Sequence, residues 1–172
     1  MHIKILDSSH RNAVEALNER CFGPARHLRT ASLLRDGAPS LGEASLVAIG
    51  DDGTLIGSVQ CHMLEWRRLD GAARDIVLLG PLVSHPDHRG QGIGGSLMDA
   101  SLAAIDSLDL PTMLIGDAPF YGRWNFRADM TGQWILPGPV ERARLLLRAA
   151  PDVFWDSVGT PSAGADPVRR AA

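Results

Sequence analysis

Cysteines and long hydrophobic runs are scarce in this sequence. Of its 172 residues only Cys21 and Cys61 are cysteines, too few for a disulfide framework and without the Cys-x-x-Cys spacing of a zinc or redox site. No stretch reaches the roughly 18 uncharged apolar residues of a membrane span. The opening residues MHIKILDSSH lack the apolar segment of a secretory signal. We therefore expect a cytoplasmic protein without a membrane partner.

The sequence also has no large excess of positive or negative charge. The formal net charge of -3 provides no global basic field, so we do not expect nucleic acid as a partner. A chain of this length commonly folds around one core. The end of the chain, GTPSAGADPVRRAA, is small, polar and proline-containing. We predict one domain over residues 1–158 and a flexible tail over residues 159–172.

The hydrophobic pattern that is present predicts a mixed α/β fold. The segments SLVAI and TLIGSVQCHML flank a glycine- and aspartate-rich turn at residues 50–53 and should form an antiparallel hairpin. DIVLLGPLV reads as a central strand, and TMLIG should lie parallel to it across a helical crossover. We also expect strands at QWIL and within ERARLLLRAA.

Pro81 interrupts the predicted central strand. Proline cannot donate a hydrogen bond to a β-ladder, so inside a strand it belongs at an edge or a bulge. Gly80 beside it favours a bulge at this point.

Four glycines follow the same strand and open a predicted helix. Gly90, Gly92 and Gly95 satisfy the G-x-G-x-x-G pattern of dinucleotide-binding domains, and Asp117 ends the next strand where a ribose-binding acid would sit. However, the six residues SHPDHR separate the strand from the glycines, and the preceding strands are expected to be antiparallel. A dinucleotide-binding oxidoreductase domain is therefore the less favoured alternative.

The same residues also fit an anion cradle of the form Arg89-x-x-Gly92-x-Gly94. Glycines let the backbone approach a ligand closely, and a helix N-terminus supplies convergent N–H groups and about half a positive charge. A diphosphate fits such a cradle.

At these residues the sequence resembles the GNAT superfamily (GCN5-related N-acetyltransferases), as a small, bacterial-type, single-domain member. LVSHPDHRG is similar to the apolar-apolar-x-His-Pro-x-x-Arg-Gly pattern of the family, and PFYGRWNF to its Phe-Tyr-x-Arg/Lys-x-Gly-Phe, with Asn125 in place of the glycine. The resemblance covers roughly residues 1–150. It implies a mixed central sheet of about six to seven strands, with a splayed, bulged central strand and flanking helices.

The resemblance also implies acetyl-CoA as cosubstrate, and no metal. Backbone groups of Leu82, Val83 and Ser84 would meet the acetyl carbonyl and the pantetheine arm. The diphosphate would lie on the glycine loop, formed by Arg89, Gly90, Gln91, Gly92, Ile93, Gly94 and Gly95.

Tyr121, the only tyrosine, matches the general acid of the family by position. A tyrosine with an ordinary pKa of about 10 is protonated at neutral pH and could protonate a departing thiolate. The amine must lose a proton, for which Glu65, Asp75, His62 and His85 are all candidates. His85 and His88 with only Asp87 beside them form too weak a set to suggest a metal.

The resulting hypothesis is acetyl transfer to a small-molecule amine or to a protein or peptide amine. Direct attack in a ternary complex is expected because we expect no cysteine near the glycine loop that could form a covalent intermediate. In the family the acceptor site is formed by the first two helices and by later strand connections, here residues 22–27 and the surroundings of Trp134. Arg26 or Arg29 would attract an acceptor carboxylate. A catalytically silent acyl-CoA-binding sensor is the alternative, and a homodimer is left open.

Overall fold

The computed structural model describes residues 1–165, which divide into two compact units. Unit 1 comprises Met1–His27, Ser40–Cys61 and Leu79–Asp109, and unit 2 comprises Leu28–Pro39, His62–Leu78 and the described residues from Leu110 onward. Seven strands in this part of the chain form one sheet of order β1-β2-β3-β4-β5-β6, with β7 paired to β3. The predicted mixed α/β fold is confirmed.

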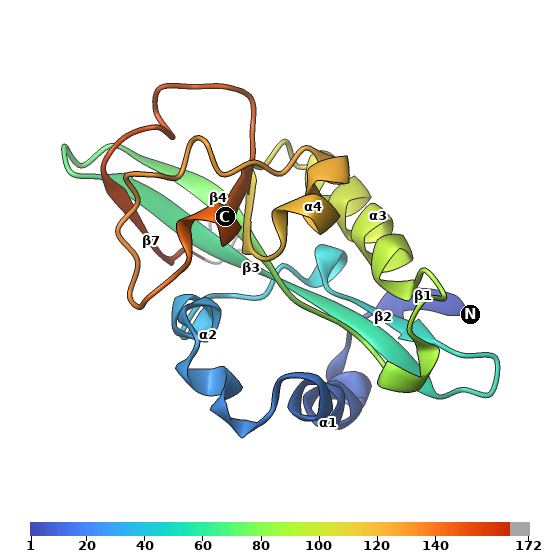
Figure 1. Ribbon diagram of the computed structural model, residues 1–172. Helices are drawn as coiled ribbons and strands as arrows, with labels where there is room; N and C mark the ends of the chain where they lie inside the picture. The colour runs from blue at the N-terminus through green and yellow to red at the C-terminus, as the bar shows by residue number, and fades with distance from the viewer. Residues whose placement is uncertain (166–172) are drawn as a thin grey trace. The chain divides into compact units, whose positions relative to one another are not determined.

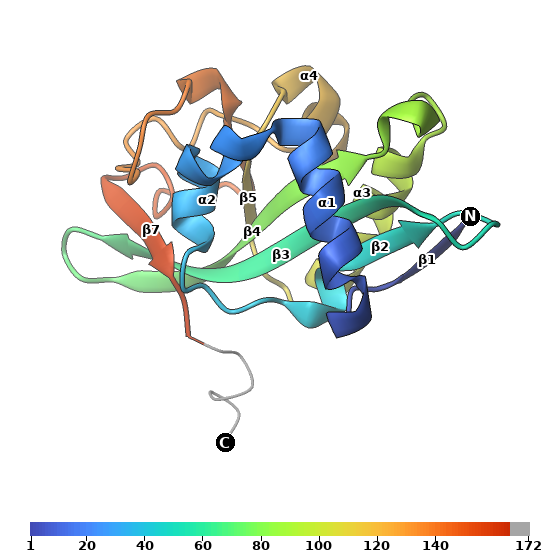
Figure 2. The same cartoon turned by 90° about the horizontal axis from the view of Figure 1, so that it is seen from below.

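Unit 1 is built on the predicted hairpin. β1 (His2–Ile5) pairs antiparallel with β2 (Leu46–Ile49), and β2 pairs antiparallel with the first residues of β3 (Leu55–Arg68). The connecting turn has Gly53 at φ 82°, a conformation that favours glycine. The helices α1 (Arg11–Phe22) and α3 (Ile93–Asp106) lie on opposite faces of these strands in Figure 1 and Figure 2. Short 3-10 turns complete the unit: η1 (Ser8–His10), η3 (Gly42–Ala44), η4 (Pro86–His88) and η2 (Pro24–Leu28), whose last residue already belongs to unit 2.

The first turn of α3 packs closely on β3 at Gly57. A Cβ at this position would lie 2.6 Å from Cγ2 of Ile93 and 3.1 Å from the carbonyl oxygen of Val83. Ile93 and Leu97, which face this glycine from α3, are both fully buried. The missing side chain therefore allows α3 to begin directly against the sheet.

Unit 2 contains the parallel pair that the sequence predicts. The first half of β4 (Ala73–Ser84) lies parallel to β5 (Thr112–Ile115), with Val77 opposite Thr112 and Leu78 opposite Met113. β5 in turn pairs antiparallel with β6 (Leu145–Arg148), so the segment ERARLLLRAA contains the expected strand. The remaining elements are α2 (Thr30–Arg35), α4 (Ala118–Tyr121), η5 (Gly122–Trp124), η6 (Arg142–Arg144) and β7 (Gly159–Ala163).

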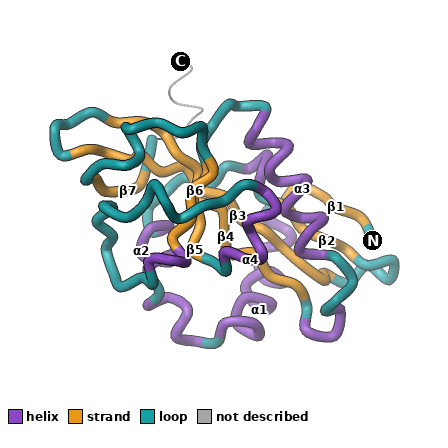
Figure 3. Tube along the Cα trace, turned by 45° about the horizontal axis from the view of Figure 1, so that its top comes forward, coloured by secondary structure: helices purple, strands orange, loops and turns teal. Residues whose placement is uncertain are grey.

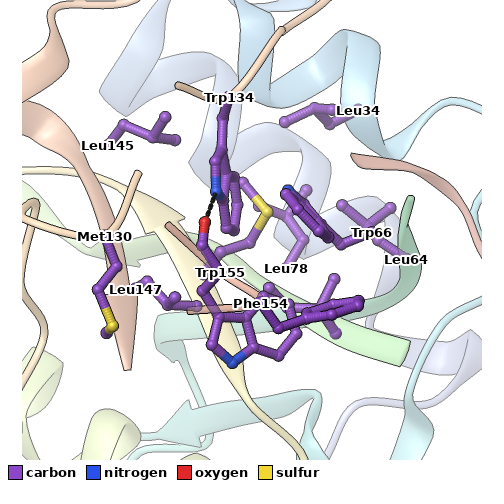
Figure 4. Packing of buried hydrophobic residues seen from close by; sticks show 12 residues of the cluster. Leu34, Leu64, Trp66, Leu78, Met130, Trp134, Leu145, Leu147, Phe154 and Trp155 are labelled. Atoms are coloured by element: carbon purple, nitrogen blue, oxygen red, sulfur yellow. Dashed lines mark hydrogen bonds between the residues drawn. The ribbon is translucent and has the colours of Figure 1, made fainter. Parts of the chain in front are cut away.

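Aromatic rings fill the core of unit 2 (Figure 4). The ring of Trp66 lies 5.4 Å from that of Trp134, 5.0 Å from that of Phe154 and 5.7 Å from that of Trp155, measured between centroids. The indole N–H of Trp134 donates to the carbonyl oxygen of Trp155 at 2.8 Å, which satisfies a buried donor. This packing orders the loop that carries residues 152–156.

Two sequence predictions are corrected in this unit. QWIL is not a strand: the chain between η5 and η6 is mostly loop (Figure 3), and Trp134 makes only an isolated bridge with Gly159. The predicted tail begins too early, because Gly159–Ala163 forms β7 on β3. A Cβ on Gly159 would lie 2.5 Å from the Trp66 ring, so a glycine is needed for this strand to reach β3. Residues 166–172 of the predicted tail lie outside the described residues.

The close contact at Gly57 predicts a specific loss of stability. Gly57→Ala should lower the free energy of unfolding by about 1–3 kcal/mol, the usual cost of overpacking, because Ile93 and a backbone oxygen must move. Urea denaturation measures this change. Gly42→Ala is the matched control, since no atom lies within 4 Å of a Cβ there. Equal unfolding midpoints for the two variants would contradict the close packing of α3.

Candidate active site

The glycine loop of unit 1 joins β4 to α3 and is open to solvent. Arg89, Gly90, Gln91 and Gly92 are all exposed. Gly90 has φ 80° and Gly92 has φ 76°, so both occupy left-handed conformations that other residues rarely adopt. Gly92 is the N-cap of α3 and, like any glycine, has no side chain to cap the helix.

The first amides of α3 are therefore available to a ligand. The N–H of Ser96 donates to the carbonyl oxygen of Gly92 at 3.0 Å, so the N–H groups of Ile93, Gly94 and Gly95 precede the helical hydrogen-bond pattern. Open space surrounds a Cβ built on Gly95. Three amides at the positive end of a 14-residue helix, with an exposed arginine beside them, can bind an anion.

The last residues of β4 lead into this loop. Gly80 has φ 132°, a conformation that favours glycine, so the backbone of the strand is irregular where the sequence predicts a bulge. Leu82 and Ser84 are half-buried, whereas Val83 is buried. The amide of His85 donates to the carbonyl oxygen of Ile56 at 2.8 Å, which fixes the end of the strand on β3.

Cys21 corrects one expectation. Although it is distant in sequence, its thiol on α1 lies 3.6 Å from the carbonyl oxygen of Ser84 and donates to it. Burial raises the pKa of the Cys21 thiol, and the positive charges of Arg89 and Arg20 offset this only partly. A cysteine thus lies beside the end of β4, but it is held as a protonated thiol rather than as a nucleophile. No local pattern in the sequence indicates this contact.

Tyr121 lies in unit 2, at the end of α4. The amides of Phe120 and Tyr121 donate to the carbonyl oxygen of Asp117 at 2.9 and 3.1 Å, which forms the single helical turn. The Tyr121 ring lies 4.8 Å from the Phe120 ring and 6.1 Å from the Phe126 ring. Burial, and next the charge of Asp117, raise the pKa of Tyr121 to about 12, while Arg144 acts in the opposite direction. The hydroxyl group therefore stays protonated at neutral pH and can donate a hydrogen bond.

The candidate bases differ in their surroundings. Burial, and secondarily the charge of Arg35, lower the pKa of His62 to about 4, so its ring is neutral at pH 7. Glu65 forms an ion pair with Arg67. His85 belongs to unit 1, and its Nδ1 accepts a hydrogen bond from the amide of Asp87 at 3.3 Å. His62, Glu65 and the half-buried Asp75 belong to unit 2.

Two residues expected at the acceptor side, Arg26 and Trp134, make contacts within the protein instead. Arg26 is bound by Glu15 at 2.7 Å and also by Glu19, so its charge is already neutralised by two carboxylates from α1. Trp134 is fully buried in the core of unit 2 and lines no open surface. The expectation that Arg26 attracts an acceptor carboxylate is therefore not supported by its contacts.

The described residues contain neither a metal-binding cluster nor a membrane-spanning helix. No group of three or more histidine, cysteine or acidic side chains in that part of the chain could hold a metal ion. Residues 1–165 also include no helix that is long and apolar enough to cross a membrane.

Comparison with known sequences identifies one family. The sequence model of the acetyltransferase (GNAT) family matches residues 11–121, which is well over half of the chain. That range includes the hairpin, β4, the glycine loop, α3 and Tyr121. A comparison with curated protein sequences found no match.

Solved structures with the same fold include two bacterial proteins. The GNAT family N-acetyltransferase YhbS from Escherichia coli, solved with CoA, is 22% identical with a TM-score of 0.73, over 95% of this chain and 89% of that one. A GNAT family acetyltransferase from Brucella melitensis, solved with acetyl-CoA, is 24% identical with a TM-score of 0.64, over 95% and 96%. Arabidopsis thaliana Naa50, solved with the bisubstrate analogue CoA-Ac-MVNAL, is 17% identical with a TM-score of 0.54, over 85% and 95%.

These findings correct the dinucleotide alternative. A dinucleotide-binding domain begins with parallel β-α-β units, whereas β1, β2 and β3 are antiparallel here. Gly90, Gly92 and Gly95 fit the letters of the fingerprint but follow β4 rather than the first strand.

The charges around Tyr121 predict pKa changes of opposite sign. Asp117→Asn should lower the pKa of Tyr121 from about 12, because it removes a negative charge that disfavours the tyrosinate. Arg144→Gln should raise this pKa. Tyrosinate absorbance reports Tyr121 alone because the chain has one tyrosine, and circular dichroism recorded at each pH verifies the fold. Shifts of the same sign in both variants would refute the assignment of these charges.

Proposed function

Because the chain belongs to the acetyltransferase (GNAT) family, we propose that it transfers an acetyl group from acetyl-CoA to an amine by direct attack in a ternary complex. The observation that supports this proposal is that the amides of Ile93, Gly94 and Gly95 precede the helical hydrogen-bond pattern and follow an exposed arginine. Its fold resembles proteins solved with CoA and with acetyl-CoA.

The diphosphate of acetyl-CoA is assigned to the glycine loop. Arg89 supplies a permanent positive charge, and Gly90, Gln91 and Gly92 bring the backbone close to the ligand. The amides of Ile93, Gly94 and Gly95 then donate to phosphate oxygens. Since these contacts use mostly main-chain atoms, a protein with a formal net charge of -3 still binds an anionic cofactor locally.

The pantetheine arm and the acetyl carbonyl are assigned to the backbone of Leu82, Val83 and Ser84. Pro81, within β4, cannot donate a ladder hydrogen bond, so the ladder lacks one donor just before these residues. The carbonyl oxygen of Ser84 accepts a hydrogen bond from the Cys21 thiol and retains a second lone pair, which can accept one from a ligand N–H.

The reaction requires one proton to leave the amine and one to reach the thiol. The neutral amine nitrogen attacks the thioester carbonyl and a tetrahedral intermediate forms. Its nitrogen then loses one proton to solvent, and the C–S bond breaks to give the amide and the CoA thiolate. Tyr121 donates its hydroxyl hydrogen to the departing sulfur and regains a proton from solvent. Because the pKa of Tyr121 is about 12, the hydroxyl is fully protonated at neutral pH and acts first as a hydrogen-bond donor to the thiolate.

A base removes a proton from the ammonium form of the acceptor. The candidates for this base are His62, Glu65, Asp75 and His85. His62 is neutral at pH 7, but a pKa of about 4 makes it a weak base. Glu65 and His85 already interact with Arg67 and Asp87. A primary amine is the acceptor class that we propose, from either a small molecule or a peptide.

Thiol release from acetyl-CoA in the presence of a panel of primary amines tests the proposed reaction. The wild-type protein should release CoA in an amine-dependent way, and mass spectrometry should find the acceptor heavier by one acetyl group. Tyr121→Phe should lower kcat by about 100-fold or more, the typical contribution of a general acid, with a small change in KM for acetyl-CoA. Thermal stabilisation of Tyr121→Phe by CoA is the control for intact binding.

Other outcomes contradict defined parts of the proposal. Stabilisation by CoA without thiol release for any amine would favour the silent acyl-CoA-binding sensor. Stabilisation by NAD but not by CoA would refute the cofactor assignment. An unchanged rate in Tyr121→Phe would refute the role of Tyr121 alone.

A further inference from the structure

The side chain of Tyr121 occupies the space that a side chain at position 116 would need. A Cβ built on Gly116 would lie 2.9 Å from Cδ2 of Tyr121 and closer still to Cε2, whereas real Cβ atoms essentially never come within 3.0 Å of another heavy atom. It would also lie 3.1 Å from Cδ1 of Leu114. The tyrosine ring thus rests directly on the glycine backbone.

The backbone conformation does not explain the glycine. The φ of Gly116 lies outside the positive range that disfavours other residues. An alanine could therefore adopt the local backbone geometry, and only the space taken by the tyrosine ring and by Leu114 excludes it.

The backbone around Gly116 is held at both sides and cannot easily move away. The amide of Gly116 donates to the carbonyl oxygen of Arg144 at 2.9 Å, and the next residue, Asp117, pairs with the guanidinium of Arg144 at 3.2 Å. The carbonyl oxygen of Asp117 then accepts the amide of Tyr121 itself. A side chain at position 116 would therefore displace the ring more readily than the backbone.

Neighbouring rings limit where the tyrosine ring could go. The Phe120 and Tyr121 rings meet edge to face, and the ring of Phe126, which is 2% exposed, packs on the same tyrosine. The guanidinium of Arg123 stacks on both Phe120 and Trp124, at 4.4 Å from each centroid. One orientation of Tyr121 is thereby defined by this aromatic cluster on one side and by Gly116 on the other.

From this geometry we infer that Gly116 is a positioning residue for the acid step, whose missing side chain sets where the Tyr121 hydroxyl is presented. The inference rests on the proposed function for its catalytic consequence. Because it acts through Tyr121, it should affect the chemical step rather than cofactor binding, which we assign to the backbone of unit 1.

The test compares Gly116→Ala with Gly122→Ala. Gly122 directly follows Tyr121, has φ −58° and has no atom within 4 Å of a built Cβ, so it is a matched control. Gly116→Ala should lower kcat at least about tenfold, a part of the usual effect of a misplaced general acid, with KM for acetyl-CoA changed less than about twofold. Gly122→Ala should behave as wild type, and in a Tyr121→Phe background Gly116→Ala should cause little further loss.

A second measurement reads the ring directly and needs no activity. The pKa of the single tyrosine, followed by tyrosinate absorbance, should fall from about 12 toward its ordinary value in Gly116→Ala and stay unchanged in Gly122→Ala. An unchanged tyrosine titration with full kcat would overturn the inference. If the wild type is inactive, the proposed function fails, while a titration shift confined to Gly116→Ala still supports the positioning of the ring.

Discussion

Close approaches at glycine determine how both parts of the proposed site are held. Ile93 of α3 lies where a side chain on Gly57 would extend, and the Tyr121 ring lies where a side chain on Gly116 would extend. In each case a part of the proposed site rests on bare backbone, so its position is defined by contact rather than by a flexible side chain. Gly90 and Gly92 add the left-handed conformations that bring the loop to the start of α3.

The proposed chemistry separates binding from proton transfer. Binding is assigned to main-chain groups of unit 1, where the amides at the start of α3 need no particular side chain. Proton transfer is assigned to Tyr121 in unit 2, whose pKa depends on burial and on the charges of Asp117 and Arg144. In this proposal, substitutions near Tyr121 change the rate of the acid step without altering the backbone assigned to the cofactor.

Local patterns in the sequence predicted the hairpin and the parallel pair β4–β5. These features depend on residues near one another in the chain. Contacts between distant residues carry no such signal. The thiol of Cys21 contacts Ser84 across 63 positions of sequence. β7 pairs with β3 through a close approach of Gly159 to Trp66, although β7 contains Pro161. Gly116 could have been noticed only as a glycine five residues before the single tyrosine.

Amide NMR can test whether the first amides of α3 bind the cofactor diphosphate. Titration of the ¹⁵N-labelled protein with CoA should shift the signals of Gly94 and Gly95 most strongly, together with that of Ile93. Pantetheine, which lacks the diphosphate, should leave these signals nearly unchanged. Binding of CoA with no change at Gly94 and Gly95 would refute the assignment of the diphosphate to these amides.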